Sequence, residues 1–373
     1  MRFARVGLLT LTGCLFLGVA SAEPKPALAG PKPVAGTKPA TPVTSCKNGD
    51  LAECTAKCEQ KDALSCARLG DIYVKGRAVP YDAAKAFSFY KQSCDGGSRV
   101  GCVGLGISYE FGRGVPQDDT RAVSEYQRAC DAKDAFGCAH LGYMYRFGRG
   151  RLARDESHAF ALFSQACTEG DAWGCTSLGE LHERGLGTAK DEPRAFSLFK
   201  EACDKGFALG CAHLGIMYEL GKGTTKNGPK AVELYTQACD EKDMLACLEL
   251  GLMLEKGQGG LKKDFPKAFA LFTEACDHKE MAGCNELGVV YAEGKGTPKD
   301  PTKAVEYYKL ACDHSEMLAC GNYGWHLFKG FGVTKNEADG IALLHKSCEA
   351  KEKFGCDKLK EAEQKAPGAK SAP

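Results

Sequence analysis

The stretch EACDKGFALGCAHLG, residues 201–215, decides the fold, because it places Cys203 and Cys211 eight positions apart around a polar turn. A continuous helix would separate two such residues by about 12 Å, whereas bridged cysteines need Cα atoms within about 7 Å of each other. The chain must therefore turn back between them. We expect a first helix that ends near Cys203, a second helix that opens at Cys211, and a disulfide that joins the two.

The same interval recurs along the whole chain. All but one of the 21 cysteines form pairs of this spacing, and from Cys58 onward successive pairs lie 36 or 37 residues apart. A fixed period of this length is typical of stacked structural repeats. Zinc is a rival use for cysteine, but structural zinc sites favour close Cys-x-x-Cys pairs, so we expect no metal. The predicted disulfides are Cys46–Cys54, Cys58–Cys66, Cys94–Cys102, Cys130–Cys138, Cys167–Cys175, Cys203–Cys211, Cys239–Cys247, Cys276–Cys284, Cys312–Cys320 and Cys348–Cys356.

The two ends of the chain differ in composition from the repeats. Residues 1–22 have the basic start, apolar run and small-residue cleavage site of a secretory signal peptide. A lipoprotein box at 11–14 is the alternative, in which a lipid on Cys14 would be the attachment to a membrane. Residues 23–45, rich in proline and lysine, predict a disordered linker, and 365–373 a disordered tail. An even number of remaining cysteines is typical of a disulfide framework, so we expect an exported protein, periplasmic or secreted.

The array between these ends, residues 46–364, has a helical pattern. In RAFSLFKEAC, residues 194–203, apolar and small residues recur at three- and four-residue steps. Asp or Asn, which are preferred at helix N-caps, lies twelve residues before the first cysteine of each unit from the second onward. These predicted caps are Asp82, Asp118, Asp155, Asp191, Asn227, Asp264, Asp300 and Asn336.

The second helix of each unit carries a glycine four residues after its cysteine. Such a glycine costs about 1 kcal/mol relative to alanine, so its recurrence predicts a notch where another backbone packs closely. A Gly-x-Gly sequence then closes the helix. Residues 46–57 are expected to cap the N-terminal end, and Lys360 gives the last helix a polar outer side. The notch glycines are Gly70, Gly106, Gly142, Gly179, Gly215, Gly251, Gly288 and Gly324.

Together these features predict an all-α protein, a right-handed α-solenoid of about nine disulfide-stapled helix-turn-helix repeats of 36–37 residues. We expect a monomer. The 49 lysines and arginines nearly balance the 48 aspartates and glutamates, so nothing indicates a nucleic-acid partner.

The pattern A(F/V)xL(F/Y)xxACDxxxxxGCxxLGxxYxxGxG resembles the Sel-like repeat, a relative of the tetratricopeptide repeat. The cysteine spacing is similar to that of the cysteine-rich, Hcp-type (β-lactamase-like) family, and also to that of an assembly factor of respiratory oxidase. The resemblance covers about residues 46–364. It implies a binding scaffold, although some Hcp-type members are described as binding or hydrolysing penicillins.

A β-lactamase would need a nucleophile and a base. The motif Ser-x-x-Lys occurs twice, as Ser88 with Lys91 and as Ser197 with Lys200. Both pairs lie on the polar side of the first helix of a repeat, and the companion motifs Ser-Asp-Asn and Lys-Thr-Gly are absent. A solvated helix face is therefore the favoured interpretation.

Other chemically versatile residues are interpreted as structural. His140 and His213 occupy matching slots of the second helix, as repeat variants do, and Trp173 and Trp325 are expected to pack near that helix. Every Gly-x-Gly follows a helix rather than linking a strand to one, so no phosphate-binding loop and no cofactor is expected.

What remains is a shape that binds a partner. A curved stack of helix pairs has an inner groove that receives a peptide or protein segment. The favoured hypothesis is an exported scaffold for protein–protein interaction in the cell envelope. A penicillin-binding protein or β-lactamase, and an assembly or maturation factor for an exported complex, stay open as alternatives. Because the first helix usually lines the groove in related arrays, the candidate contacts are Lys91, Glu125, Lys200, Glu201, Glu233, Glu306 and Lys309.

Overall fold

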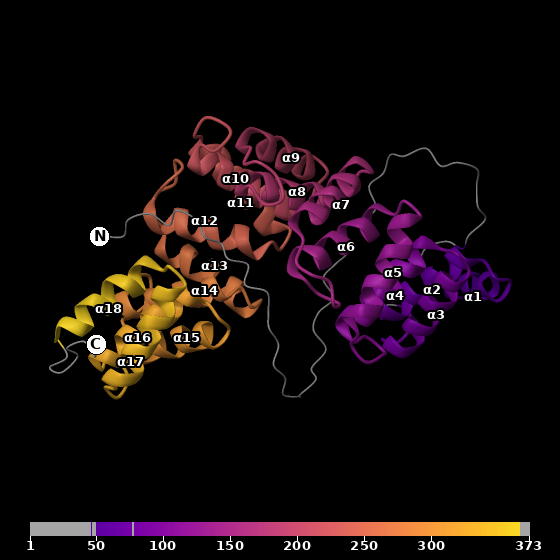
Figure 1. Ribbon diagram of the computed structural model, residues 1–373. Helices are drawn as coiled ribbons and strands as arrows, with labels where there is room; N and C mark the ends of the chain where they lie inside the picture. The colour runs from indigo at the N-terminus through magenta and orange to yellow at the C-terminus, as the bar shows by residue number, and fades with distance from the viewer. Residues whose placement is uncertain (1–45, 47–49, 77, 366–373) are drawn as a thin grey trace. The chain divides into compact units, whose positions relative to one another are not determined.

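The computed structural model describes residues 46, 50–76 and 78–365. The predicted signal peptide, linker, lipid site and tail beyond 365 lie outside these residues. The described residues form 18 α-helices and no β-strand (Figure 1). In chain order the helices are α1 (Leu51–Glu59), α2 (Ala63–Lys75), α3 (Ala83–Asp95), α4 (Arg99–Phe111), α5 (Asp119–Asp131), α6 (Ala135–Phe147), α7 (Glu156–Thr168), α8 (Ala172–Arg184), α9 (Glu192–Asp204), α10 (Ala208–Leu220), α11 (Gly228–Asp240), α12 (Met244–Lys256), α13 (Phe265–Asp277), α14 (Met281–Glu293), α15 (Pro301–Asp313), α16 (Met317–Lys329), α17 (Glu337–Glu349) and α18 (Lys353–Lys365).

These helices confirm the predicted all-α solenoid of helix pairs. Each odd-numbered helix forms a hairpin with the even-numbered helix that follows it, and consecutive hairpins pack on one another within each of two compact units. The first unit, up to Thr225, contains α1 to α10, and the second, from Lys226, contains α11 to α18. The sequence predicts one uninterrupted array over 46–364, and its periodicity shows no sign of this division.

The predicted helix ends are confirmed. Each of the eight predicted caps accepts a hydrogen bond from the backbone N–H three residues later. Asp82 Oδ1, for example, lies 2.9 Å from the nitrogen of Lys85. Such a cap stabilises a helix by about 1 kcal/mol. The even-numbered helices from α2 to α16 end at a left-handed glycine, as in α8, where Gly185 has φ 68°.

A left-handed residue also makes the turn inside each hairpin, three positions after the first cysteine. It is glycine in three hairpins, at Gly97, Gly170 and Gly206. In the other six it is Lys61, Lys133, Lys242, Lys279, Ser315 or Lys351. This tight turn brings the cysteines together, and the ten pairs are joined as disulfides with Cα–Cα distances between 4.4 and 4.8 Å.

Six of the notch glycines face an aromatic ring of the next odd-numbered helix, whereas a backbone was expected. A Cβ added at Gly179 would lie 2.7 Å from a ring carbon of Phe199, so only glycine admits the ring. At the last notch Leu344 replaces the ring, and a Cβ at Gly324 would lie 2.8 Å from the backbone oxygen of Gly340. At Gly288 a backbone oxygen, that of Ala304, would also lie 3.1 Å from an added Cβ. The other ring neighbours are Tyr90 at Gly70, Tyr126 at Gly106, Phe163 at Gly142, Phe272 at Gly251 and Tyr308 at Gly288.

The even-numbered helices lie on the inner side of each stack. In the first unit α2, α4, α6, α8 and α10 each contact the next of their kind, and in the second α16 contacts both α14 and α18. No two odd-numbered helices of the described residues approach each other as closely. A stack whose even-numbered helices touch while its odd-numbered helices spread must bend toward the even-numbered side. These contacts do not support the expectation that the first helix of each pair lines a groove, which stays a prediction.

Candidate functional site

An aromatic cluster lies on the even-numbered side of the first unit. Phe136, His140, Tyr143 and Phe147 follow one another at steps of three and four residues along α6, so they share one face of that helix. Trp173, from the first turn of α8, completes the cluster, with its ring centroid 4.8 Å from His140 and 5.9 Å from Phe136. All five side chains are partly exposed, so rings of the cluster are accessible at the surface.

A buried network of charged side chains packs beneath the aromatic cluster and fixes the position of its His140 ring. The carboxylate of Glu110, on α4, accepts hydrogen bonds from Tyr126 Oη and Arg149 Nη1, each at 2.6 Å. It also lies 3.5 Å from Nδ1 of His140, whose ring stacks on Tyr126. Burial alone would raise the pKa of Glu110, but the bonds to His140 and Tyr126 and the charge of Arg149 lower it below its ordinary value. The carboxylate therefore stays ionised and fixes the position of the His140 ring.

A second buried pair repeats this arrangement one hairpin further on. Glu180 of α8 is bonded to Arg146 of α6 at 2.8 Å and lies 3.5 Å from Nε2 of His213 on α10. The His213 ring stacks on Phe199. His140 and His213 are thus structural parts of the contacts between even-numbered helices. The ion pairs Glu110–Arg149 and Arg146–Glu180 link the three hairpins that contain α4, α6 and α8. The aromatic cluster therefore lies on a rigid base.

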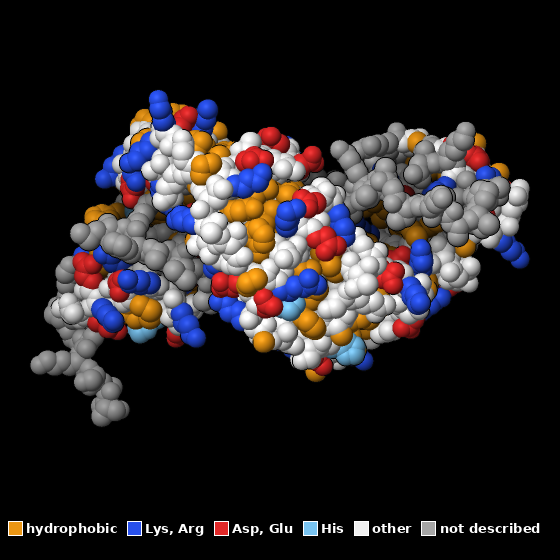
Figure 2. All heavy atoms as spheres, turned by 90° about the horizontal axis from the view of Figure 1, so that it is seen from above, with side chains coloured by type: hydrophobic (Ala, Val, Ile, Leu, Met, Phe, Trp, Pro, Cys, Tyr) orange, Lys and Arg blue, Asp and Glu red, His pale blue; other side chains and the backbone are white. Residues whose placement is uncertain are grey.

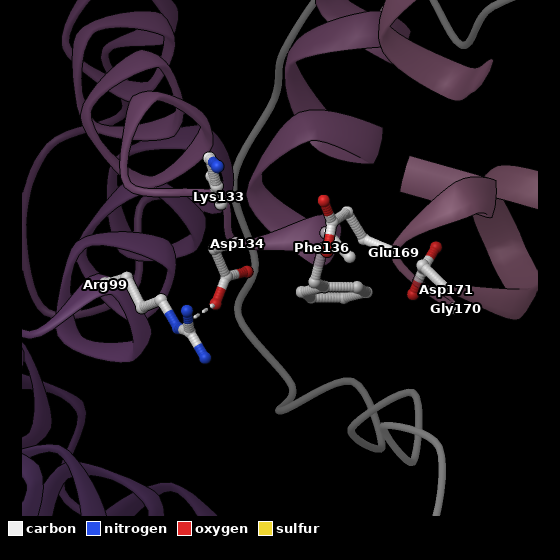
Figure 3. Close-up of a pocket in the computed structure, with 8 residues that line it drawn as sticks. Arg99, Lys133, Asp134, Phe136, Glu169, Gly170 and Asp171 are labelled. Carbon is white, nitrogen blue, oxygen red and sulfur yellow. Dashed lines mark ion pairs between the residues drawn. The ribbon is translucent and has the colours of Figure 1, made fainter. Parts of the chain in front are cut away.

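A hollow of about 510 Å³ opens beside the cluster. Figure 3 shows the ring of Phe136 between the carboxylates of Asp134 and Asp171, and the Glu169 side chain extends toward Phe136 from the neighbouring hairpin turn. Arg99 of α4 forms an ion pair with Asp134 at 3.5 Å. Burial raises the pKa of Asp171, although a hydrogen bond from the backbone of Gly174 opposes the shift. The hollow therefore combines one aromatic wall with polar groups of both signs.

The even-numbered side of the second unit presents a different ring. Trp325 of α16 lies between two lysine side chains, with Lys329 Nζ 4.5 Å and Lys358 Nζ 4.3 Å from its ring centroid. These are cation–π distances. Deeper between α14 and α16, Asn322 donates a hydrogen bond to Asn285 at 2.8 Å. The second unit thus joins these even-numbered helices through neutral amides and holds its tryptophan with cations.

The two Ser-x-x-Lys pairs lie on exposed helix faces. Lys91 Nζ is bonded to Asp95, and Lys200 Nζ to Asp204, each at 2.6 Å. These partners raise the pKa of both lysines, whereas a general base at neutral pH requires a lowered lysine pKa. Ser197 already donates its hydroxyl hydrogen to the backbone oxygen of Pro193 at 3.1 Å. Nothing in this geometry activates a nucleophile.

The groove contacts chosen from the sequence lie on the odd-numbered helices, away from the inner side. Lys309 pairs with Asp313 on its own helix, as Lys91 and Lys200 pair on theirs. Sequence reasoning singled out His140 and Trp173 separately but missed the aromatic cluster that they form, because its residues belong to two helices. Alignment of the repeats by their second cysteine would have revealed the stripe of rings along α6.

On the face shown in Figure 2, positive and negative side chains are interspersed.

These hairpins, with glycine notches filled by rings, define the class of tetratricopeptide-like helical repeats. The chain belongs to the Sel1 repeat family, which matches residues 63–98, 100–134, 135–171, 174–207, 208–243, 245–279, 282–315 and 318–351. Among the described residues, no helix is long and apolar enough to cross a membrane.

Three solved structures illustrate the likeness. A Sel1 repeat protein from Oxalobacter formigenes has a TM-score of 0.55 and 24% identity, over 60% of this chain and 89% of that one. Cysteine-rich protein B of Helicobacter pylori is 30% identical over 36% of this chain and 96% of its own, with a TM-score of 0.30. The antigen c5321 of uropathogenic Escherichia coli is 21% identical, over 86% and 92%, with a TM-score of 0.32. Among curated proteins no match was found.

Proposed function

We propose that the chain is an exported scaffold that binds a protein partner in the cell envelope, and that it docks this partner on the aromatic cluster of α6 and α8. Sel1 repeats are typically modules of protein–protein interaction, and this coarser role is the starting point. The observation that carries the proposal is the cluster itself. Its rings are partly exposed although they sit on a rigid, charge-linked base.

The chemistry of the cluster suits a protein segment better than a small molecule. Aromatic side chains on a fixed base contribute large contact area at little cost in conformational entropy, as binding hot spots do. The adjoining hollow is open and carries Arg99, Asp134, Glu169 and Asp171, which can form hydrogen bonds at the rim of an interface. A partner that inserts an apolar side chain beside Phe136 would contact both the aromatic rings and the polar groups of the hollow.

Export is supported by the disulfides. Disulfides form and persist mainly in oxidising compartments and are rare in the cytosol, so ten bridges in one chain favour export. The N-terminal residue of the mature chain tests this part of the proposal. Mass spectrometry of the protein from a cell-envelope fraction should find a chain that starts at Glu23, or one that starts at a lipidated Cys14. A chain that still starts at Met1 in the cytosol would contradict export.

Site-specific cross-linking tests the docking surface. A photo-reactive residue at Phe136 should capture a discrete partner in the cell envelope, whereas one at Ala161, exposed on α7 and two helical turns away from Glu169, should not. The capture from position 136 should disappear when Trp173→Ala is introduced, with the circular dichroism spectrum unchanged. Equal capture from both positions, or capture that survives Trp173→Ala, would refute this surface.

A further inference from the structure

The last disulfide of the array differs from the other nine in its exposure. In the other nine pairs, every cysteine is at most 8% exposed. Cys348 and Cys356, which join α17 to α18, are both partly exposed. All ten pairs share the same sequence separation of eight, so the difference arises from what covers them.

The cover of an inner disulfide comes from the odd-numbered helix of the following hairpin. Glu125 of α5 places Oε2 3.3 Å from Sγ of Cys94, and Arg128 bonds to Glu125 at 2.7 Å. Glu201 of α9 lies 3.7 Å from Sγ of Cys175, and Lys205 lies 4.0 Å from the same sulfur. An ion pair thus rests on each of these two disulfides.

Such a cover hinders thiol–disulfide exchange in two ways. It blocks the approach of a thiolate to the sulfur, and its carboxylate disfavours the thiolate that must leave. These disulfides also offer no thiolate to a metal, although three of them lie near a glutamate. Among the described residues no ion pair is placed on Cys348–Cys356 as Glu125 and Arg128 are placed at Cys94, and both cysteines are partly exposed.

We propose that Cys348–Cys356 is a site of thiol–disulfide exchange for small thiols and for dithiol reductants, and that its reduction releases α18 from α17. The proposal does not depend on the docking surface of α6 and α8. It requires only that the array is oxidised.

The positions of the two sulfurs in their helices set the direction of attack. Cys356 lies in the first turn of α18, where the positive end of the helix favours a thiolate, and Cys348 lies in the last turn of α17. The incoming thiolate therefore attacks Sγ of Cys348, and Cys356 leaves as the thiolate. With a dithiol, the second thiol loses its proton and attacks the dithiol's own sulfur in the mixed disulfide. Cys348 then leaves as a thiolate, and two electrons have passed from the dithiol to the pair.

Timed reduction tests the site. The oxidised full chain is exposed to dithiothreitol, quenched with iodoacetamide at intervals and mapped by peptide mass spectrometry. Cys348 and Cys356 should be alkylated at least about tenfold faster than the other cysteines, because access controls the rate. The double substitution Glu201→Ala and Lys205→Ala should accelerate Cys167 and Cys175 alone. Equal rates for all pairs, or an inner pair that reacts first, would overturn the proposal.

The direction of thiolate attack and the release of α18 are tested by separate measurements. A monothiol such as glutathione, trapped by rapid acidification, should be found on Cys348, and an adduct mainly on Cys356 would refute the proposed direction of attack. Hydrogen exchange should speed up in α18 after partial reduction and stay unchanged in α6. An unchanged rate in α18 would show that the disulfide does not hold this helix. Cys348→Ser with Cys356→Ser should reproduce the faster exchange without any reductant.

Discussion

The two units are built from the same hairpin, but the contact between α6 and α8 in the first unit differs from the contact between α14 and α16 in the second. In the first unit, Arg146 and Glu180 form a buried ion pair between α6 and α8. In the second, Asn285 and Asn322 form a neutral hydrogen bond between α14 and α16. The comparison teaches that the repeat prescribes the hairpin and leaves the contact between hairpins free to vary. The exposed aromatic cluster lies above the charged contacts.

The largest effect is expected where a buried charge loses its partner. Glu180→Ala leaves the guanidinium of Arg146 uncompensated and should lower the free energy of unfolding by about 3–5 kcal/mol. Asn285→Ala, its counterpart in the second unit, removes an amide hydrogen bond from Asn322 and a hydrogen bond to the Glu286 carboxylate, and should cost only about 1–3 kcal/mol. Urea unfolding of the oxidised proteins measures both losses. Equal losses would mean that the two contacts do not differ in kind.

The shared hairpin should respond alike in both units. Gly179→Ala and Gly251→Ala each place a Cβ within 2.7 Å of a phenylalanine ring, and each should cost about 1–3 kcal/mol through overpacking. Ser88→Ala, at an exposed position of α3, is the control and should stay within about 0.5 kcal/mol of wild type. A notch that tolerates alanine in one unit only would break the equivalence of the two hairpins.

The hairpin turn allows a test of opposite sign in the two units. Lys242→Gly replaces a left-handed lysine, φ 67°, and should stabilise the second unit by about 1 kcal/mol. Gly170→Lys makes the reverse change in the first unit, where the glycine has φ 96° and no atom within 4 Å of an added Cβ, and should destabilise it by a similar amount. Thermal unfolding measures both shifts. Shifts of the same sign would show that left-handed strain is not the cause.

The smallest effect concerns a histidine in each unit. Burial lowers the pKa of His182 below its usual value of 6.5, and it also lowers that of His326, where a hydrogen bond to Phe331 acts in the opposite direction. The unfolded chain therefore binds the proton more tightly, so stability is lost as the pH falls below about 6.5.

His182→Tyr tests this in the first unit. This substitution introduces the tyrosine that other repeats have at the same position, where it forms a cation–π contact, as Tyr109 does with Arg121. It should add about 0.5–1 kcal/mol and remove part of the loss between pH 7 and pH 5, measured by urea titration at both values. The contribution of His326 should stay. An unchanged pH dependence would exclude His182 as its source.

Much of the local structure could be predicted because it depends on nearby residues. The N-cap of α9 at Asp191 and the left-handed glycine at Gly185 follow from residues within one helical turn. The notch at Gly179 was recognised, but the Phe199 ring that fills it lies 20 positions away and was not. The sequence could not show which helices contact each other across the repeats, because both helices of a hairpin have an apolar face.

The sequence by itself determined that this protein is an array of helix hairpins, each closed by its own cysteines. That result needed only the helical rise and the reach of a disulfide. Only the tertiary structure decided which helices touch across the repeats, and hence that Phe136, His140 and Trp173 meet and that Cys348–Cys356 is left uncovered. These contacts join different hairpins, and the packing of their side chains, which the period of the repeat does not encode, brings them together.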